Sequence, residues 1–512
     1  MEITERLDAL TSWHADWKGL RVAVLGLSVT GFSTADTLTE LGAEVLVLSE
    51  SAKEEYARLI PVIGARLELG SLAEVPDALR EFAPEVVIAS PGFPPTHPLI
   101  EWTIQQGIAL WGDVELAWRV RDKVVRADGT PAEWVLITGT NGKTTTTELT
   151  ASFLTAGGLR AAPCGNIGIP VLDAVRDPGG FDVLVVELSS HQLWYLGRSA
   201  PAGQLVPHAA SCLNLADDHL VWHGSAEAYR AAKAFVYRNT RVACVYNKSD
   251  EATLRMVEEA DVIEGARAIG FDLGTPGPSD VGVVDGILVD RAFHDDRRHS
   301  ALELTTVAEL ASVGLSAPHI VQNILAASAL ARSLGTSPAD IHDALQTFTM
   351  DAHRIQIVAE HRGIRWVDDS KATNPHAAAS SLRAYPGAVW IVGGDLKGVA
   401  LGDLVEHAGS TASAAVVIGA DREPVLSAFR RHAPHVPVAE VVPADTGEVM
   451  DRVVELAAGM IDGEGTVLLA PAAASFDQFR SYADRGERFA AAVRAWIERG
   501  SADDPDGSPA TH

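Results

Sequence analysis

The sequence is poor in cysteine and in positive charge, and it has no long apolar run. Its three cysteines, Cys164, Cys212 and Cys244, form no C-x-x-C pair, which predicts free thiols in a reducing compartment. The 41 Lys and Arg against 68 Asp and Glu give a net charge of −27, which argues against a nucleic-acid partner. No apolar stretch reaches about 18 residues, so no membrane insertion is expected, and residues 1–20 lack the apolar core of a signal peptide. We therefore expect a cytoplasmic protein.

The chain does contain repeated alternation of β-rich and helix-compatible runs. Its 512 residues favour about three domains. The pattern predicts an α/β fold with a Rossmann-like N-terminal unit, a central P-loop ATPase-type parallel sheet and a C-terminal Rossmann-like α/β domain. Breaks in periodicity place these at residues 1–128, 129–350 and 351–498, with a disordered polar tail over 499–512.

The clearest motif is V-L-I-T-G-T-N-G-K-T-T-T-T-E at residues 135–148. A predicted strand (134–137) runs into a glycine turn, and a helix-compatible run (147–155) follows. Such a turn directs backbone N–H groups and a helix N-terminus at one point, which suits a phosphate. Lys143 adds a charge for the β- and γ-phosphates, and Thr144 a hydroxyl for Mg²⁺. Because two residues rather than four separate the first glycine from Gly-Lys, the loop departs from the common P-loop.

The N-terminal region contains a second glycine turn between a predicted strand (21–25) and a predicted helix (32–41). Ser28 replaces the middle glycine of G-x-G-x-x-G, the position at which the backbone approaches a dinucleotide. This disfavours NAD and leaves a nucleoside diphosphate site or a plain βα turn. A later strand (85–89) ends in the turn-rich loop 90–95, where open α/β sheets bind ligands.

Three further polar residues are candidates for chemistry. Glu187 follows a predicted strand (182–186), from which a carboxylate can reach Mg²⁺. Lys233, flanked by alanines and Phe235, is more typical of a lysine that snorkels, whereas burial near a metal would lower its pKa. His219 on composition alone is more typical of a surface or capping histidine.

Nine motifs, in order, resemble the Mur ligases, over about residues 20 to 495. They read T-G-T-N-G-K-T-T (138–145), G-N-I-G-I-P (165–170), E-L-S-S-H-Q-L (187–193), N-L-A-D-D-H-L (214–220), Y-R-A-A-K (229–233), H-R (353–354), D-D-S-K-A-T-N (368–374), G-G-D-L-K (393–397) and A-A-A-S-F-D-Q-F (472–479). Their number and order, across the second and third predicted domains, make the resemblance specific.

The resemblance implies ATP-dependent amide formation in peptidoglycan synthesis. A substrate carboxylate attacks the γ-phosphate of ATP, and an amino acid then displaces phosphate from the acyl phosphate. The motifs are most similar to those of the members that add D-glutamate to UDP-N-acetylmuramoyl-L-alanine. The implied cofactors are ATP and Mg²⁺ at two sites, and we expect a monomer acting on small molecules.

The resemblance also implies roles for individual residues. Lys143, Glu187, His219 and Lys233 are implied to be catalytic, and Thr144, Glu187, His219 and a carbamylated Lys233 to hold Mg²⁺. The implied ATP contacts are Gly139, Thr140, Asn141, Gly142, Lys143, Thr144, Thr145, Asn323, Arg354 and Asp369. The implied contacts to the UDP substrate are Ser28, Val29, Thr30, Ser90, Gly92, Asn166 and Gln192. The implied D-glutamate contacts are Lys371, Thr373, Lys397, Ser475 and Tyr482.

Three positions depart from the family pattern. His191 and Tyr482 stand where Phe is common, and Ile320 where the adenine motif usually has Asn. His191 affects the expected shape of the acyl or uracil pocket, and Ile320 affects one expected contact to adenine. A sister Mur-type or folylpolyglutamate-type ligase with another amino acid remains an alternative. A Rossmann oxidoreductase and a non-catalytic nucleotide-binding scaffold are alternatives of other classes.

Overall fold

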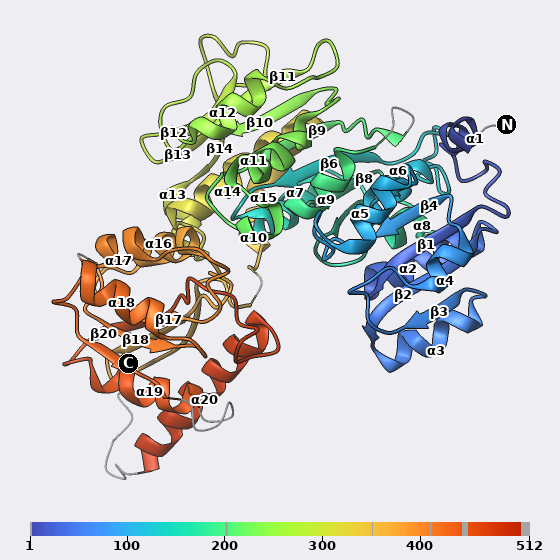
Figure 1. Ribbon diagram of the computed structural model, residues 1–512. Coiled ribbons are helices and arrows are strands. Elements are labelled where there is room, and N and C mark those ends of the chain that lie inside the picture. Colours follow the sequence, from blue (N-terminus) through green and yellow to red (C-terminus); the bar gives the residue numbers. More distant parts are fainter. Residues whose placement is uncertain (1–2, 200–202, 351, 410, 443–448, 503–512) are drawn as a thin grey trace. The chain divides into compact units, whose positions relative to one another are not determined.

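The computed structural model describes residues 3–199, 203–350, 352–409, 411–442 and 449–502 (Figure 1). Three sheets of five, nine and six strands follow one another along the chain, which confirms the predicted α/β class. The residues group into two compact units. The first holds residues 1–215 and 222–348, and the second holds residues 216–221 and 349–512.

The first sheet has the strand order β3-β2-β1-β4-β5, and all its pairings are parallel. This is the Rossmann strand order 3-2-1-4-5-6 without its sixth strand. Its strands are β1 (Arg21–Leu27), β2 (Glu44–Ala52), β3 (Arg66–Leu69), β4 (Val86–Ala89) and β5 (Ala109–Trp111). The helices of this region are α1 (Ile3–Ala9), α2 (Val29–Glu40), α3 (Glu54–Val62), α4 (Asp77–Phe82), α5 (Pro98–Gln105) and α6 (Asp113–Arg119).

The second sheet has the order β14-β13-β12-β11-β10-β9-β6-β8-β7, parallel from β7 to β12 and antiparallel beyond. Its strands are β6 (Glu133–Thr138), β7 (Ala161–Gly165), β8 (Val183–Glu187), β9 (Ala209–Cys212), β10 (Ala243–Asn247), β11 (Arg267–Phe271), β12 (Asp280–Val284), β13 (Ile287–Asp290) and β14 (Leu302–Thr306). Its helices are α7 (Lys143–Ala156), α8 (Val171–Arg176), α9 (Ser190–Leu196), α10 (Leu220–His223), α11 (Ala226–Ala234), the 3-10 turn η2 (Phe235–Tyr237), α12 (Glu251–Glu258), α13 (Val307–Ser312), α14 (Pro318–Ser333) and α15 (Pro338–Thr347).

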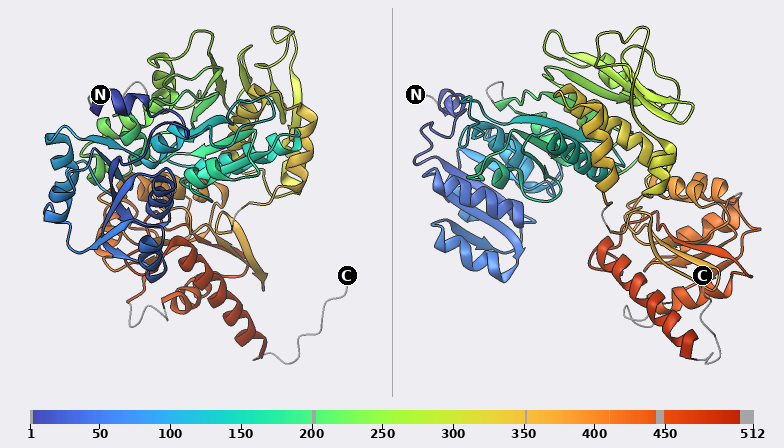
Figure 2. Two further views of the ribbon diagram at one scale, coloured as in Figure 1. Left: turned by 90° about the vertical axis from the view of Figure 1, so that its right-hand side faces the viewer. Right: turned by 180° about the vertical axis from the view of Figure 1, so that it is seen from behind.

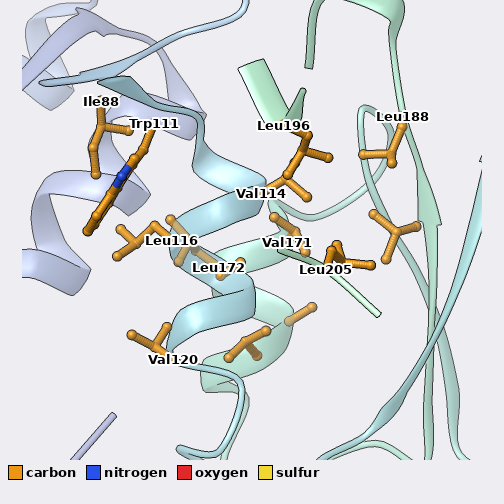
Figure 3. Packing of buried hydrophobic residues seen from close by; sticks show 14 of the residues in the cluster. Ile88, Trp111, Val114, Leu116, Val120, Val171, Leu172, Leu188, Leu196 and Leu205 are labelled. Carbon is orange, nitrogen blue, oxygen red and sulfur yellow. The ribbon is translucent and has the colours of Figure 1, made fainter. Parts of the chain in front are cut away.

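The first two sheets share one continuous hydrophobic core. Figure 3 shows side chains of α6, such as Val114 and Leu116, beside Val171 and Leu172 of α8. All four are buried. Apolar burial is the main favourable term in packing, so this shared core holds the two sheets together within the first unit.

The third sheet has the order β15-β16-β20-β17-β18-β19, and β15 pairs with β16 as an antiparallel hairpin. Its strands are β15 (Gln356–His361), β16 (Ile364–Asp368), β17 (Val389–Gly393), β18 (Ala414–Ile418), β19 (Val438–Glu440) and β20 (Gly465–Leu469). Its helices are α16 (Pro375–Ala384), α17 (Gly402–Ala408), α18 (Glu423–His432), α19 (Val449–Gly459) and α20 (Tyr482–Ala502).

Alternate residues of these strands enter two separate cores, as the two-residue period of a strand requires. Trp390 and Val392 pack under α16, α17 and α18, whereas Val389 and Ile391 pack against α19 and α20. The two helix groups therefore cover opposite faces of this sheet (Figure 2).

The C-terminal helix α20 continues to Ala502, into the tail that the sequence predicts to be disordered. Residues 503–512 of that tail lie outside the described residues. Among the helices that the structure describes, none combines the length and apolarity needed to cross a membrane.

Candidate active site

The predicted P-loop is a tight turn between β6 and α7. Gly142 caps α7 with a left-handed φ of 81°, and the helix begins at Lys143, before the predicted start at 147. Asn214, which follows β9, holds the turn through two hydrogen bonds. Its backbone O accepts a hydrogen bond from Thr140 N at 3.0 Å, and its side-chain Oδ1 accepts one from Asn141 N at 2.8 Å. The turn thus presents the N-terminus of a long helix at the carboxyl end of a parallel sheet, where an anion binds well.

Both candidate lysines lie at this turn. Lys143 Nζ donates to Gly139 O at 3.0 Å and to Thr140 O at 2.9 Å. Lys233 Nζ donates to the same Gly139 O at 2.8 Å and to Thr138 Oγ1 at 3.2 Å. Only 2% of Lys233 is exposed. The interpretation of Lys233 as a snorkelling surface lysine is therefore wrong, because α11 directs this side chain into the sheet end.

Glu187 ends β8 directly beside β6, in register with Ile137. The side chain is buried, and Asn166 Nδ2 donates to its Oε1 at 2.8 Å. Its Oε2 is buried and has no hydrogen-bond partner among the described residues. A buried carboxylate oxygen without a donor is costly, and a bound cation would relieve that cost. Thr144, in the first turn of α7, is also buried, so two oxygen donors that suit Mg²⁺ border the P-loop.

Two more residues pack on the loop. Asn323 of α14 lies so close to Gly142 that a Cβ there would overlap the Asn323 side chain. Tyr229 of α11 bonds through its hydroxyl to Thr140 Oγ1 at 2.9 Å. The structure therefore brings Asn323 together with the other predicted ATP contacts of the first unit.

The predicted nucleotide loops of the first sheet lie side by side, because β1 and β4 are neighbours. Ser28 precedes α2, whose first turn carries Val29 and Thr30. Ser90 N donates to Leu25 O at 2.9 Å, and Ser90 Oγ is a buried hydroxyl without a partner among the described residues. This strand end therefore offers a helix N-terminus and an unsatisfied hydroxyl. Gly92, in the same loop, has open space around its Cα.

Gln192 has structural partners within the first unit. It forms a capping box with Ser189 at the start of α9, and its Nε2 donates to Asp113 Oδ2 at 3.3 Å. Asp113 is buried, and its Oδ1 is without a partner in the described part of the chain. Desolvation raises the pKa of Asp113 to about 6, against the lowering effect of the hydrogen bond from Gln192.

The second unit holds the predicted nucleotide contacts Arg354 and Asp369. Asp369 is buried, and desolvation raises its pKa to about 6, whereas the hydrogen bond from Ser381 and the charge of Arg354 lower it. Next to them, His353 Nδ1 and Asp368 Oδ2 lie 2.6 Å apart, and this hydrogen bond raises the pKa of His353.

His219 belongs to the short segment 216–221 that groups with the second unit, whereas Lys143, Glu187 and Lys233 belong to the first. It adopts a left-handed φ of 52°, and its Nε2 lies 3.6 Å from Asp218 Oδ2. Asp218 also pairs with Lys397 Nζ at 3.8 Å. In the described ranges no group of three or more His, Cys, Asp or Glu forms a metal cluster.

The predicted D-glutamate residues follow the carboxyl ends of β16, β17 and β20, in three loops and, for Tyr482, at the start of α20. Lys371 Nζ lies 3.8 Å from the ring centroid of Tyr482. Thr373 N donates to Lys371 O at 2.8 Å, and Ser475 is buried. The loop of Lys397 is joined to that of Ser475 by the bridge Asp395–Ala474. Cations and hydroxyls are the groups that bind carboxylates.

Sequence reasoning missed Arg485, a fully buried cation of α20. It donates to Ser370 Oγ at 2.9 Å, to Ser370 O at 2.8 Å and to Ala473 O at 3.1 Å. It therefore joins the loop of Lys371 to the loop of Ser475. Asn214 and Tyr229 were also missed as P-loop supports, although both lie inside quoted motifs. Asp113 lies in no motif and gave no signal.

The structure shows what surrounds His191 and Ile320, two of the residues that depart from the family pattern. The ring of His191 lies 4.3 Å from that of Trp222 and 5.6 Å from that of His223. Ile320 is buried in the first turns of α14.

Comparison with known proteins gives a consistent result. Residues 137–331 match the Mur ligase middle domain, and residues 353–473 match the Mur ligase, glutamate ligase domain. The chain is similar to UDP-N-acetylmuramoylalanine–D-glutamate ligase of Leifsonia xyli, with 62% identity over 99% of this chain and 98% of that protein. It is 49% identical to the protein of the same name from Streptomyces coelicolor, over 94% of this chain and 99% of that protein.

Solved structures show the same fold at lower identity. UDP-N-acetylmuramate-alanine ligase MurC from Thermotoga maritima has a TM-score of 0.53 and 18% identity, covering 94% of this chain and 99% of that one. A pseudomurein peptide ligase type C from Methanothermus fervidus has a TM-score of 0.54 and 17% identity, covering 93% and 100%. With both domain matches and with relatives at high identity over nearly their full length, the chain belongs to the Mur ligase family.

Proposed function

We propose that this chain is the ATP-dependent ligase that joins D-glutamate to UDP-N-acetylmuramoyl-L-alanine, a step in making the peptidoglycan precursor. The observation that carries the proposal is the 62% identity, across 99% of the chain, to a relative of that name. The arrangement of Lys143, Glu187 and Lys233 around one phosphate-binding turn supports it.

The reaction has two bond-forming steps. A carboxylate oxygen of the donor attacks the γ-phosphorus of ATP, the bond to ADP breaks, and an acyl phosphate forms. The amine of D-glutamate then attacks the acyl carbon, and phosphate leaves with one oxygen of the donor. Two negatively charged groups must meet in the first step, so charge neutralisation is the main requirement on the protein.

Residues of the P-loop would meet that requirement. The N–H groups at the start of α7 and the ammonium of Lys143 would bind the β- and γ-phosphates. Lys143 would exchange its hydrogen bonds to Gly139 O and Thr140 O for bonds to phosphate oxygens. The other contacts to the nucleotide that the resemblance implies are Thr140, Asn141, Thr145, Asn323, Arg354 and Asp369.

The donor set also fits Mg²⁺. Thr144 and Glu187, with its buried unsatisfied Oε2, would hold one ion, and His219 with Lys233 would hold another. Lys233 as an ammonium is a donor only, so it needs carbamylation to become an oxygen ligand. The ions would neutralise phosphate charge. A carbamate carbon signal after labelling with ¹³C-bicarbonate, present in the wild type and absent in Lys233→Arg, would support this modification. The same signal in both proteins would refute it.

The UDP part of the donor, its acyl part and D-glutamate would bind at separate loops. Ser28, Val29, Thr30, Ser90 and Gly92 would hold the UDP part, and Asn166 and Gln192 the acyl part. Lys371, Thr373, Lys397, Ser475 and Tyr482 would bind the two carboxylates of D-glutamate. Since one chain supplies all of these residues, we propose a monomer that acts on these small molecules in the cytoplasm.

Amino-acid specificity tests the proposal. Phosphate release from ATP with UDP-N-acetylmuramoyl-L-alanine should require D-glutamate and should stay at background with L-glutamate, L-alanine, L-lysine and meso-diaminopimelate. Release with one of the others would assign the chain to a sister ligase. No release with any of them would refute the ligase function.

A further inference from the structure

A row of polar contacts, which we call the α2–α8 seam, joins the first sheet's helix α2 to the central sheet's helix α8. On α2 the participating residues are Ser33, Asp36, Thr37 and Glu40, whose spacing of three and four residues places them on one face. On α8 they are Asp173 and Arg176. The two helices are in contact (Figure 1).

The seam has two ends with different chemistry. At one end, Ser33 Oγ donates to Asp173 Oδ1 at 2.5 Å. At the other, Arg176 Nη2 lies 2.6 Å from Asp36 Oδ2 and 2.8 Å from Glu40 Oε2. Its Nη1 also donates to Thr37 Oγ1 at 3.0 Å. One guanidinium thus bonds to three side chains of α2, and two of these hydrogen bonds are charge-assisted, which makes them stronger than neutral ones.

The Arg176 end is more than an exposed ion pair. The side chain of Arg176 is 17% exposed, and Thr37 is fully buried. Burial alone would lower the pKa of Arg176, but the hydrogen bonds and charges of Asp36 and Glu40 raise it above its ordinary value. Partly buried networks of this kind resist screening better than isolated surface pairs.

Each helix of the seam begins at a loop of the proposed site. Helix α2 starts after Ser28 and carries Val29 and Thr30 in its first turn, where the nucleotide end of the donor would lie. Helix α8 follows the loop 165–170, whose Asn166 contacts Glu187 at the acyl end. The Ser33–Asp173 contact lies about one turn from both loops, so the seam links the two helices close to the proposed site.

We propose that the α2–α8 seam fixes the distance between the nucleotide end and the acyl end of the donor site, and that Arg176 is its main positioning residue. The inference rests on the proposed function, because it assigns a single long donor to both loops. A donor that must contact two loops at once gains affinity only if their spacing matches its length. A fragment that contacts one loop needs no such match.

The Arg176→Ala variant separates these cases. The KM for UDP-N-acetylmuramoyl-L-alanine should rise about tenfold, which corresponds to about 1.4 kcal/mol of binding free energy. The KM for ATP and the inhibition constant of UDP alone, which would occupy only the first sheet's loop, should each stay within about twofold, as for a substitution remote from the site. The Arg176→Lys variant, which can still reach one carboxylate, should recover most of the loss.

Two controls make the result interpretable. Arg255→Ala removes an exposed arginine paired with Glu251 on α12, and it should change none of these constants. Ser33→Ala weakens the other end of the seam and should also raise the KM for the complete donor without changing inhibition by UDP. It provides a second test if Arg176→Ala fails to fold.

Equal losses for the complete donor and for UDP would indicate a merely structural role and would overturn the proposal. An unchanged KM for the complete donor in both seam variants would also overturn it. Failure of the wild type to use D-glutamate would instead refute the proposed function, so the two failures can be told apart.

Discussion

Lys143 and Lys233 both donate to the same carbonyl oxygen, that of Gly139 in the P-loop. Lys143 is the residue proposed to bind the β- and γ-phosphates through its charge. We therefore expect that Lys143→Met, which keeps the length but removes the charge, lowers kcat by at least about 100-fold, as loss of one transition-state donor does. Lys233→Met should be similarly inactive, because it removes a proposed metal ligand.

Stopped assays of phosphate release, with circular dichroism to verify folding, measure both effects. Lys53→Met provides a control, since Lys53 is an exposed lysine ahead of α3. Activity near the wild-type level in either P-loop variant would remove that lysine from the catalytic group.

Asp113 should make stability depend on pH. Its pKa is raised by burial from 3.8 to about 6. A raised pKa means that the stabilising contribution of the protonated form is complete below about pH 4 and is lost as the pH rises through about 6. The pKa change corresponds to about 3 kcal/mol. Asp113→Asn cannot ionise, so its midpoint urea concentration of unfolding should be higher than that of the wild type at pH 8. Near pH 4 the two midpoints should be similar.

Urea unfolding between pH 4 and 8 measures this difference. Glu101→Gln on α5 controls for the loss of an exposed carboxylate. Parallel pH curves for Asp113→Asn and the wild type would contradict the assignment of the pH dependence to Asp113.

At the scale of elements, the turn before α7 depends on Gly142 for two reasons. Its φ is 81°, and an added Cβ would overlap Asn323 Oδ1. Gly158, beyond the other end of α7, has a φ of 85° and open space around it. Gly158→Ala should therefore cost only the backbone strain, about 1 kcal/mol. Gly142→Ala should cost more than that and should also raise the KM for ATP.

Urea unfolding of the two variants compares backbone strain alone, in Gly158→Ala, with strain plus overlap with Asn323, in Gly142→Ala. ATP titration measures the effect of each substitution on the KM for ATP. In the double variant Gly142→Ala/Asn323→Ala the overlap is removed, so part of the lost stability should return. Equal destabilisation by the two glycine substitutions, with an unchanged KM for ATP, would contradict the close packing of Asn323 on the turn.

Local sequence signals predicted the elements that carry the site, and tertiary contacts decided the rest. The strand, glycine turn and helix around Lys143 could be predicted because backbone propensity and the motif agree there. The burial of Lys233 could not, because its alanine-rich helix has the composition of a surface helix. The roles of Asn214, Tyr229 and Arg485 depend on loops that meet only in the folded chain.

At the scale of the whole molecule, the alternation of strands and helices was enough to predict three α/β regions. It could not predict that the first two sheets share one core, because the apolar residues of α6 and α8 look like those of any amphipathic helix. Nor could it predict that the segment 216–221, with His219, groups with the C-terminal unit. Arg176 lies in no motif, so the α2–α8 seam has no signature in the sequence.

In the reaction proposed for the whole molecule, a donor carboxylate attacks ATP at the P-loop and D-glutamate completes the reaction. The most direct test is to label the L-alanine carboxylate of UDP-N-acetylmuramoyl-L-alanine with ¹⁸O and to measure the mass of the released phosphate. With D-glutamate present, we expect one ¹⁸O atom in each phosphate, because the acyl C–O bond breaks. Unlabelled phosphate would contradict the acyl phosphate and the proposed role of the site.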